Sequence, residues 1–147
     1  MTSTPRELTF ARYCALFVTL SPENLAELEP LLSPSVHFRD PLNDVRGWPQ
    51  VRHILLDLFQ RCEQPRFYIL DKHLVDGCGL LRWTFEARIP RLGWFSIEGM
   101  SRLQFDTAGR ICEQLDFWDS SPFYLRLPVV GRLFRRIRRK MAPPRTS

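Results

Sequence analysis

The chain has 147 residues, of which 44% are hydrophobic and 25% charged, a composition typical of one globular domain and not of a disordered chain. No apolar run approaches the roughly 18–20 residues of a membrane span, and the N-terminus lacks the basic and apolar regions of a secretory signal. Four scattered cysteines and three isolated histidines argue against a disulfide framework and a metal site. We therefore expect a cytoplasmic protein with reduced thiols and no metal or other cofactor.

Charge is divided unevenly along the chain. The net charge is +5, but residues 125–147 contain eight basic residues and no acid, which leaves residues 1–124 with a net charge of −3. We expect a mildly acidic domain over 1–124 and a basic C-terminal helix and tail over 125–147. Because the positive charge belongs to the tail, nucleic acid is not an expected partner of the domain.

The first half of the chain predicts helices. Apolar residues recur at three- and four-residue spacing over 7–20, which is typical of an amphipathic helix. Ser21 and Pro22 then predict the N-cap and first position of a second helix. A short strand is expected over 36–40, and a third helix over 47–63.

The second half predicts strands. From Phe67 the hydrophobic period changes to two, which predicts strands over 67–75, 79–89, 94–106 and 110–119. Short turn sequences join these segments, so the strands should form an antiparallel meander. Helices followed by hairpins are the pattern of an α+β fold.

Residues 36–47, with the sequence VHFRDPLNDVRG, resemble the turn before the third helix in the nuclear transport factor 2-like superfamily, which includes ketosteroid isomerase and SnoaL-like cyclases. The aromatic and acidic ending at 116–119 is similar too, so the resemblance covers about residues 8–120. It implies a cone-shaped α+β fold, in which a curved antiparallel sheet wraps around the N-terminal helices and leaves an apolar pocket. This fold serves enzymes, binding modules and transport adaptors, so it does not settle function.

Three residues are candidates for catalysis. Asp40 matches the general base of ketosteroid isomerase, and Tyr13 lies one turn from Leu16, which matches that enzyme's oxyanion-hole tyrosine. Ser101 stands where the same enzyme has its second, protonated aspartate. Asp116 is expected to point inward from the last strand, and two carboxylates in an apolar pocket can act as general acid and base.

Strand alternation and the family resemblance place further side chains at the pocket. The candidate ligand-binding residues are Phe38, Asn43, Trp83, Phe85, Ser101, Gln114 and Trp118. Structural alternatives stay open: Asp40 could accept backbone N–H bonds in its own turn, and the aromatic residues could belong to the core. Asp116 could equally form an ion pair with Arg46 or Arg102.

Residues 128–141 predict an amphipathic helix, with apolar side chains at three- and four-residue spacing and arginines over the remaining surface. This helix could pack on the domain over the pocket mouth, lie on an anionic membrane surface, or bind a partner. A lone basic helix is a weak signal for nucleic acid.

Two functions are consistent with these features. The first is a small-molecule-binding SnoaL-like domain with an apolar ligand, which as an enzyme would be a cofactor-independent isomerase, cyclase or hydrolase that moves a proton with Asp40. The second is a non-catalytic dimeric module that docks to a membrane or a protein partner through its basic helix. In the membrane case the protein would be a peripheral membrane protein. A homodimer is expected in either case, because resembling proteins often pair through their sheets. Whether the chain catalyses a reaction stays open.

Overall fold

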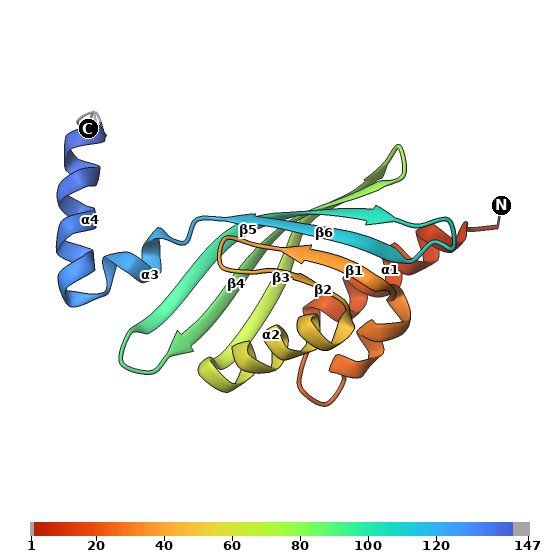
Figure 1. Cartoon of the computed structure of the whole chain (residues 1–147), viewed down its shortest axis with the longest axis horizontal. Coiled ribbons are helices and arrows are strands. Elements are labelled where there is room, and N and C mark those ends of the chain that lie inside the picture. The colour runs from red at the N-terminus through yellow and green to blue at the C-terminus, as the bar shows by residue number, and fades with distance from the viewer. Residues whose placement is uncertain (1, 143–147) are drawn as a thin grey trace.

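The fold has two layers, a curved sheet and a set of helices on its inner face, followed by two C-terminal helices (Figure 1). The computed structural model describes residues 2–142. The elements are α1 (Pro5–Val18), the 3-10 helix η1 (Leu25–Leu31), β1 (Leu32–Arg39), β2 (Asp44–Arg46), α2 (Trp48–Arg61), β3 (Glu63–Val75), β4 (Cys78–Ile89), β5 (Gly93–Phe105), β6 (Ile111–Trp118), α3 (Ser121–Leu125) and α4 (Pro128–Met141).

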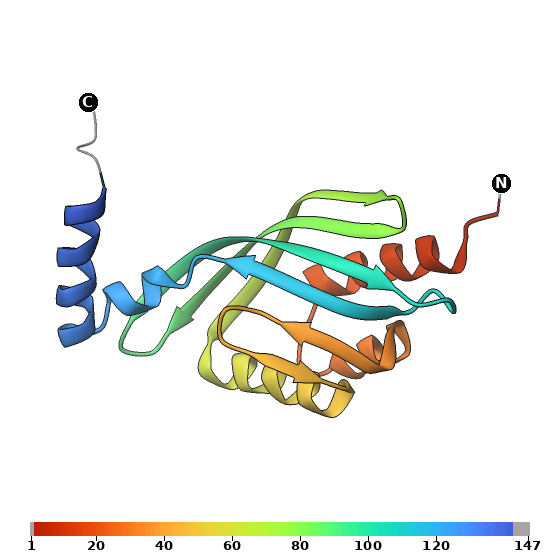
Figure 2. The same cartoon turned by 45° about the horizontal axis from the view of Figure 1, so that its top comes forward.

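The sheet contains six strands in the order β2-β1-β6-β5-β4-β3 and lies over α1, η1 and α2 (Figure 2). Strands β3 to β6 form the predicted antiparallel meander. The sheet as a whole is mixed and not entirely antiparallel, because β1 pairs with β6 in parallel. No hairpin connects these two strands, so no short turn dictates their relative direction.

The helices begin as local signals dictate, with one exception. Thr4 and Glu7 form a capping box at the start of α1, two residues earlier than the apolar pattern alone predicts. Ser21 does not cap a second helix. The side chain of Asn24 instead accepts the Ser21 backbone N–H at 2.8 Å and donates to the Thr19 carbonyl, so the helical segment starts only at Leu25, as a 3-10 helix.

The core lies between α1 and the inner face of the sheet. Phe10, Tyr13, Cys14 and Phe17 are the buried face of α1, as their spacing predicts. The most deeply buried side chains from the sheet include Val36, Leu81, Leu103 and Ile111. Because inner and outer residues alternate along each strand, this core fixes which side chains of β1 and β6 turn toward the helices.

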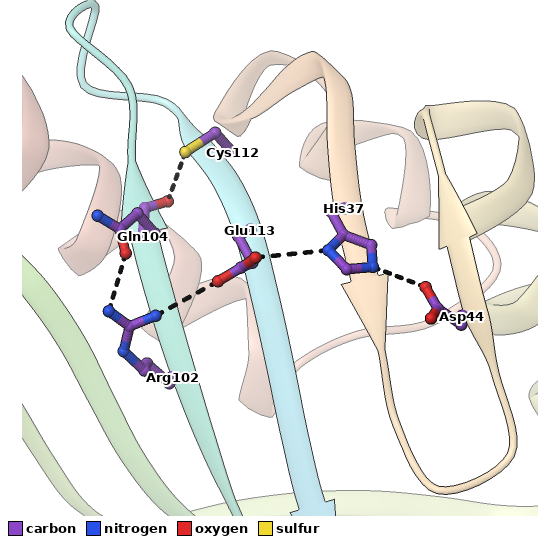
Figure 3. A network of polar contacts seen from close by, with 6 residues as sticks. All are labelled: His37, Asp44, Arg102, Gln104, Cys112 and Glu113. Atoms are coloured by element: carbon purple, nitrogen blue, oxygen red, sulfur yellow. Dashed lines mark hydrogen bonds and ion pairs between the residues drawn. The ribbon is translucent and has the colours of Figure 1, made fainter.

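A polar network lies on the outer face of the sheet and crosses four neighbouring strands (Figure 3). His37 on β1 stands 2.6 Å from Asp44 on β2 and 3.4 Å from Glu113 on β6. Arg102 on β5 donates to Glu113 at 3.3 Å and to Gln104 at 2.9 Å. The network holds His37 on the outer face of the sheet, and it engages Arg102 on the side of the sheet away from Asp116.

The C-terminal helices leave the sheet at the end of β6 and project beyond it (Figure 1). Helix α4 contacts α3 and does not lie over the inner face of the sheet, so the alternative in which it covers the pocket mouth is wrong. Within residues 2–142, no helix has the length and apolar character needed to cross a membrane.

Candidate functional site

A cavity of about 610 Å³ lies between the inner face of the sheet, α1 and α2. Its wall is mostly aliphatic and aromatic, with a few polar groups. Small-molecule sites in proteins typically have volumes of roughly 300–1,000 Å³ and a mostly apolar lining with a few polar groups, as this cavity does. The side chains from the predicted site that line it are Tyr13, Phe38, Asp40, Asn43, Trp83, Phe85, Gln114, Asp116 and Trp118.

A chain of hydrogen bonds joins five side chains at one end of this cavity. Tyr13 Oη donates to Gln114 Oε1 at 2.9 Å, and Gln114 Nε2 donates to Asp116 Oδ1 at 3.0 Å. From the other side, Trp83 Nε1 donates to Ser101 Oγ at 2.8 Å, and Ser101 Oγ donates to Asp116 Oδ1 at 2.6 Å. Both halves of the chain therefore end on the Asp116 carboxylate.

The strand register brings these groups together. Ser101 on β5 and Asp116 on β6 are directly paired, and Gln114 precedes Asp116 by two residues on the same face. Ser101, predicted to contact the ligand, does not line the cavity. It is 2% exposed and lies behind the wall, between Trp83 and Asp116.

The Asp116 carboxyl has an unusual proton affinity. Burial raises its pKa from 3.8 to about 6, although the hydrogen bonds from Ser101 and Gln114 lower it, and repulsion from Asp40 adds to the rise. The pKa of Tyr13 is also raised well above its usual value, mainly by burial and secondly by the negative charge of Asp116. Asp116 can thus exchange a proton near neutral pH, whereas Tyr13 stays a neutral donor.

Asp40 lies at the end of β1 and lines the same cavity. Its Oδ1 accepts the backbone N–H groups of Leu42 and Asn43, both at 2.7 Å, so the structural role in the turn is present. Its Oδ2 accepts only a longer bond of 3.2 Å, from Asn43 Nδ2. One oxygen therefore holds the turn, and the other keeps lone pairs for another partner.

The indole of Trp83 is held against the backbone of the neighbouring strand. Gly99 on β5 faces it so closely that a Cβ there would collide with the ring. The absent side chain at Gly99 thus lets the indole lie flat beside the strand and reach Ser101.

Several lining residues were not predicted. His53, Asp57 and Arg61 project from α2 to the cavity, and Arg61 Nε pairs with Asp57 Oδ2 at 2.8 Å. Their four-residue spacing, next to the apolar stripe of α2, was the signal for this placement. Phe123 of α3 also lines the cavity and stacks on Phe95 with ring centroids 4.7 Å apart, for which the sequence offers no local signal.

Comparison with known proteins places this architecture in a family. The family model of the SnoaL-like domain matches residues 10–114. The chain belongs to the SnoaL-like family. No curated protein sequence matches it.

Solved structures share the SnoaL-like fold at low sequence identity. A protein with a ketosteroid isomerase-like fold from Catenulispora acidiphila, solved in complex with trimethylamine, has a TM-score of 0.69 at 14% identity, over 86% of this chain and 96% of its own. A steroid delta-isomerase from Pseudomonas aeruginosa has a TM-score of 0.62 at 22% identity, over 96% and 97%. An NTF2-like protein of unknown function from Exiguobacterium has a TM-score of 0.66 at 16% identity, over 76% and 98%.

The polar groups that line this SnoaL-like site include the Asp40 and Asp116 carboxylates, the Gln114 amide and the Tyr13 phenol, in a mostly apolar wall. Among residues 2–142, no three His, Cys, Asp or Glu side chains gather in an arrangement that could hold a metal ion. What the described side chains themselves can do is bind an apolar molecule, donate hydrogen bonds to it and move a proton.

Proposed function

We propose that this protein binds an apolar, carbonyl-bearing small molecule in the cavity and transfers a proton on it, as an isomerase or cyclase of the cofactor-independent type. The observation that carries the proposal is the Asp116 carboxyl, whose pKa is raised to about 6 in the wall of an apolar cavity. A carboxyl of this kind can be present in either protonation state near neutral pH, which is what a general acid or base needs.

The two carboxylates have different roles in this proposal. Asp40 Oδ2 takes a proton from the carbon next to the ligand carbonyl, and the electron pair moves toward the carbonyl oxygen. Protonated Asp116 donates a hydrogen bond to that oxygen and stabilises its negative charge. Return of the proton from Asp40 to another carbon completes an isomerisation, with no net gain or loss of atoms or electrons.

Gln114 lets the wall adapt to the proton on Asp116. With Asp116 ionised, Gln114 Nε2 donates to the carboxylate and Oε1 accepts from Tyr13. When no ligand oxygen accepts the Asp116 proton, half a turn of the amide would reverse both bonds, because Oε1 could then accept from protonated Asp116 while Nε2 donates to Tyr13 Oη. The Asp116 carboxyl therefore keeps a hydrogen bond to Gln114 in either protonation state of the empty site.

The test separates binding from chemistry. Thermal unfolding in the presence of apolar ketones, lactones and fatty acids should identify ligands, since a ligand at 100 times its Kd stabilises by about 2.7 kcal/mol. Each hit is then incubated with the protein in D2O, and deuterium incorporation is measured by mass spectrometry. Asp40→Asn should abolish deuterium exchange into the ligand, and Asp116→Asn should reduce it strongly. Both substitutions preserve the size and shape of the side chain.

The outcomes distinguish the two parts of the proposal. No stabilising ligand in the panel would count against a small-molecule site. Ligands that stabilise the protein but exchange no deuterium, or that exchange equally well in both variants, would leave a binding protein without the proposed proton transfer.

We also propose that two copies pair through the outer face of the sheet. Met100 and Phe117 are register partners there and are 52% and 57% exposed. Arg82, Glu98 and Arg102 surround them with charges of both signs. A two-fold axis brings the same patch to itself, so an apolar centre with mixed charges around it is self-complementary.

A further inference from the structure

Helix α4 carries all its large apolar side chains on one side. Its exposed apolar residues are Val129, Val130, Leu133, Phe134, Ile137 and Met141, and they follow the three- and four-residue spacing of one helix face. The opposite surface holds Arg132, Arg135, Arg136, Arg138, Arg139 and Lys140, with no acid on the helix. Phe134 of this face stacks on Tyr124 of α3, with ring centroids 6.1 Å apart, whereas Leu133 and Ile137 are 60% and 46% exposed. Most of the face is therefore left uncovered by the described residues 2–142.

The attachment of α4 to α3 explains why the apolar face is left open. Gly131 is buried against the carbonyl of Leu125, where a Cβ would collide with the backbone. Arg135 Nη1 donates to the same carbonyl. The glycine and this arginine lie on the polar side of the helix. Helix α4 therefore contacts its own chain through that side and through the Phe134 ring, and leaves the rest of its apolar side exposed.

We propose that α4 docks this protein on the surface of an anionic membrane, lying in the headgroup region with its apolar face toward the acyl chains. An interfacial helix has this division into an apolar face and an arginine- and lysine-rich polar face. Anionic lipid headgroups complement the six basic side chains. A second copy of α4 fits the apolar face less well, because pairing would bring together two helices of six positive charges each.

The position of α3 links docking to the cavity. Phe123 lines the cavity and stacks on Phe95, and the guanidinium of Arg126 lies 3.9 Å from the centre of the Phe95 ring. Arg126 also donates to the Leu92 carbonyl at 3.0 Å. These contacts hold α3, and α4 after it, at the end of the cavity formed by Leu92 and Phe123. Docking would therefore bring that end of the cavity near the lipid surface; this consequence rests on the proposed function, whereas docking itself does not.

Co-sedimentation of the full chain with vesicles tests the proposal. The protein should pellet with phosphatidylcholine vesicles that contain phosphatidylglycerol, and much less with pure phosphatidylcholine. Leu133→Asp should lower the partition coefficient at least about tenfold, because it removes buried apolar area and adds a negative charge. Arg136→Gln and Arg139→Gln should each lower it about fivefold and reduce its dependence on salt.

Val75→Asp is the matched control for Leu133→Asp. Val75 is also exposed, at 52%, and lies in the β3–β4 hairpin away from α4. Val75→Asp introduces the same charge as Leu133→Asp, and its partition coefficient should stay within about twofold of that of the unmodified chain. Thermal unfolding of all variants checks that the domain stays folded. Because Leu133 is exposed, its substitution should have little effect on stability.

Three results would overturn the proposal. The first is that the unmodified chain does not bind anionic vesicles, and the second is that Val75→Asp weakens binding as much as Leu133→Asp does. The third is that the unmodified chain does not bind vesicles but forms a concentration-dependent oligomer that Leu133→Asp abolishes. This third result would assign the apolar face to a second copy of the chain. Ligand binding in the cavity is measured separately and can fail without affecting any of these outcomes.

Discussion

Ser101 Oγ on β5 donates a hydrogen bond of 2.6 Å to Asp116 Oδ1 on the paired strand β6. Ser101 occupies the position at which the resemblance to ketosteroid isomerase places an aspartate. In this protein the carboxyl that lines the cavity stands at the paired position of the neighbouring strand. The pair therefore keeps a carboxyl of raised pKa at the cavity, with its supporting serine fully buried behind it.

Asp116→Asn should make stability less dependent on pH. Because folding raises the pKa of Asp116 from 3.8 to about 6, the folded state binds the proton more tightly, and stability falls as pH rises through about 6. The asparagine has no proton to lose. Urea unfolding should find the variant more stable than the unmodified chain by on the order of 3 kcal/mol at about pH 8, with little difference at about pH 4.

Asp119→Asn is the control of opposite sign. Its pKa is lowered, chiefly by the hydrogen bond from the Ser121 backbone N–H, which stands 2.9 Å from Oδ1. Stability from this group is present above its unfolded pKa and is lost as pH falls through the folded one. The variant should therefore be less stable than the unmodified chain at neutral pH and equal to it in acid. The same pH trend in both variants would contradict these assignments.

Ser101→Ala should destabilise the fold and change the titration of Asp116. It leaves Trp83 Nε1 buried without its acceptor, which costs about 1–3 kcal/mol. It also removes a donor that lowers the Asp116 pKa, so that pKa should rise above about 6. Carbon-detected NMR titration of the carboxyl measures the shift, and Ser96→Ala, at an exposed position of β5, should produce neither effect.

Gly99→Ala should displace the indole of Trp83 into the cavity. The added Cβ has no room beside the ring, so we expect a loss of about 1–3 kcal/mol in the free energy of unfolding, a changed near-ultraviolet CD spectrum and weaker ligand binding. Gly79→Ala is the comparison, because its Cβ would press on Phe10 and Leu103 instead. It should destabilise the core without changing the tryptophan signal.

Phe117→Asp should convert the proposed dimer to a monomer. A charge at the centre of the outer patch would face its own copy across the two-fold axis, and like charges there repel. Sedimentation velocity at micromolar concentration measures the change, with Val75→Asp as the control. If the unmodified chain sediments as a monomer, no dimer forms through this face under these conditions.

Much of the fold could be predicted because its signals are local. The period-two segments, the turns between them and the apolar face of α1 depend on residues a few positions apart, and each predicted strand of the meander is present. The inward direction of Gln114 and Asp116 was an expectation from the family resemblance, and both side chains line the cavity. Two features were missed for local reasons. The Asn24 side chain bonds to the Ser21 backbone, so Ser21 does not act as the predicted N-cap. The strand β2 has only three residues, which is too few to give a hydrophobic pattern.

The sequence by itself determined the α+β class, the meander of strands and the division of charge between an acidic body and a basic tail, because periodicity and charge are properties of neighbouring residues. Only the tertiary structure decided that β1 runs parallel to β6, that Ser101 supports Asp116, and that α4 turns its apolar face outward. The Tyr13–Gln114 bond spans 101 positions of the chain. Such contacts, and the burial that raises the Asp116 pKa, arise only when distant elements pack together.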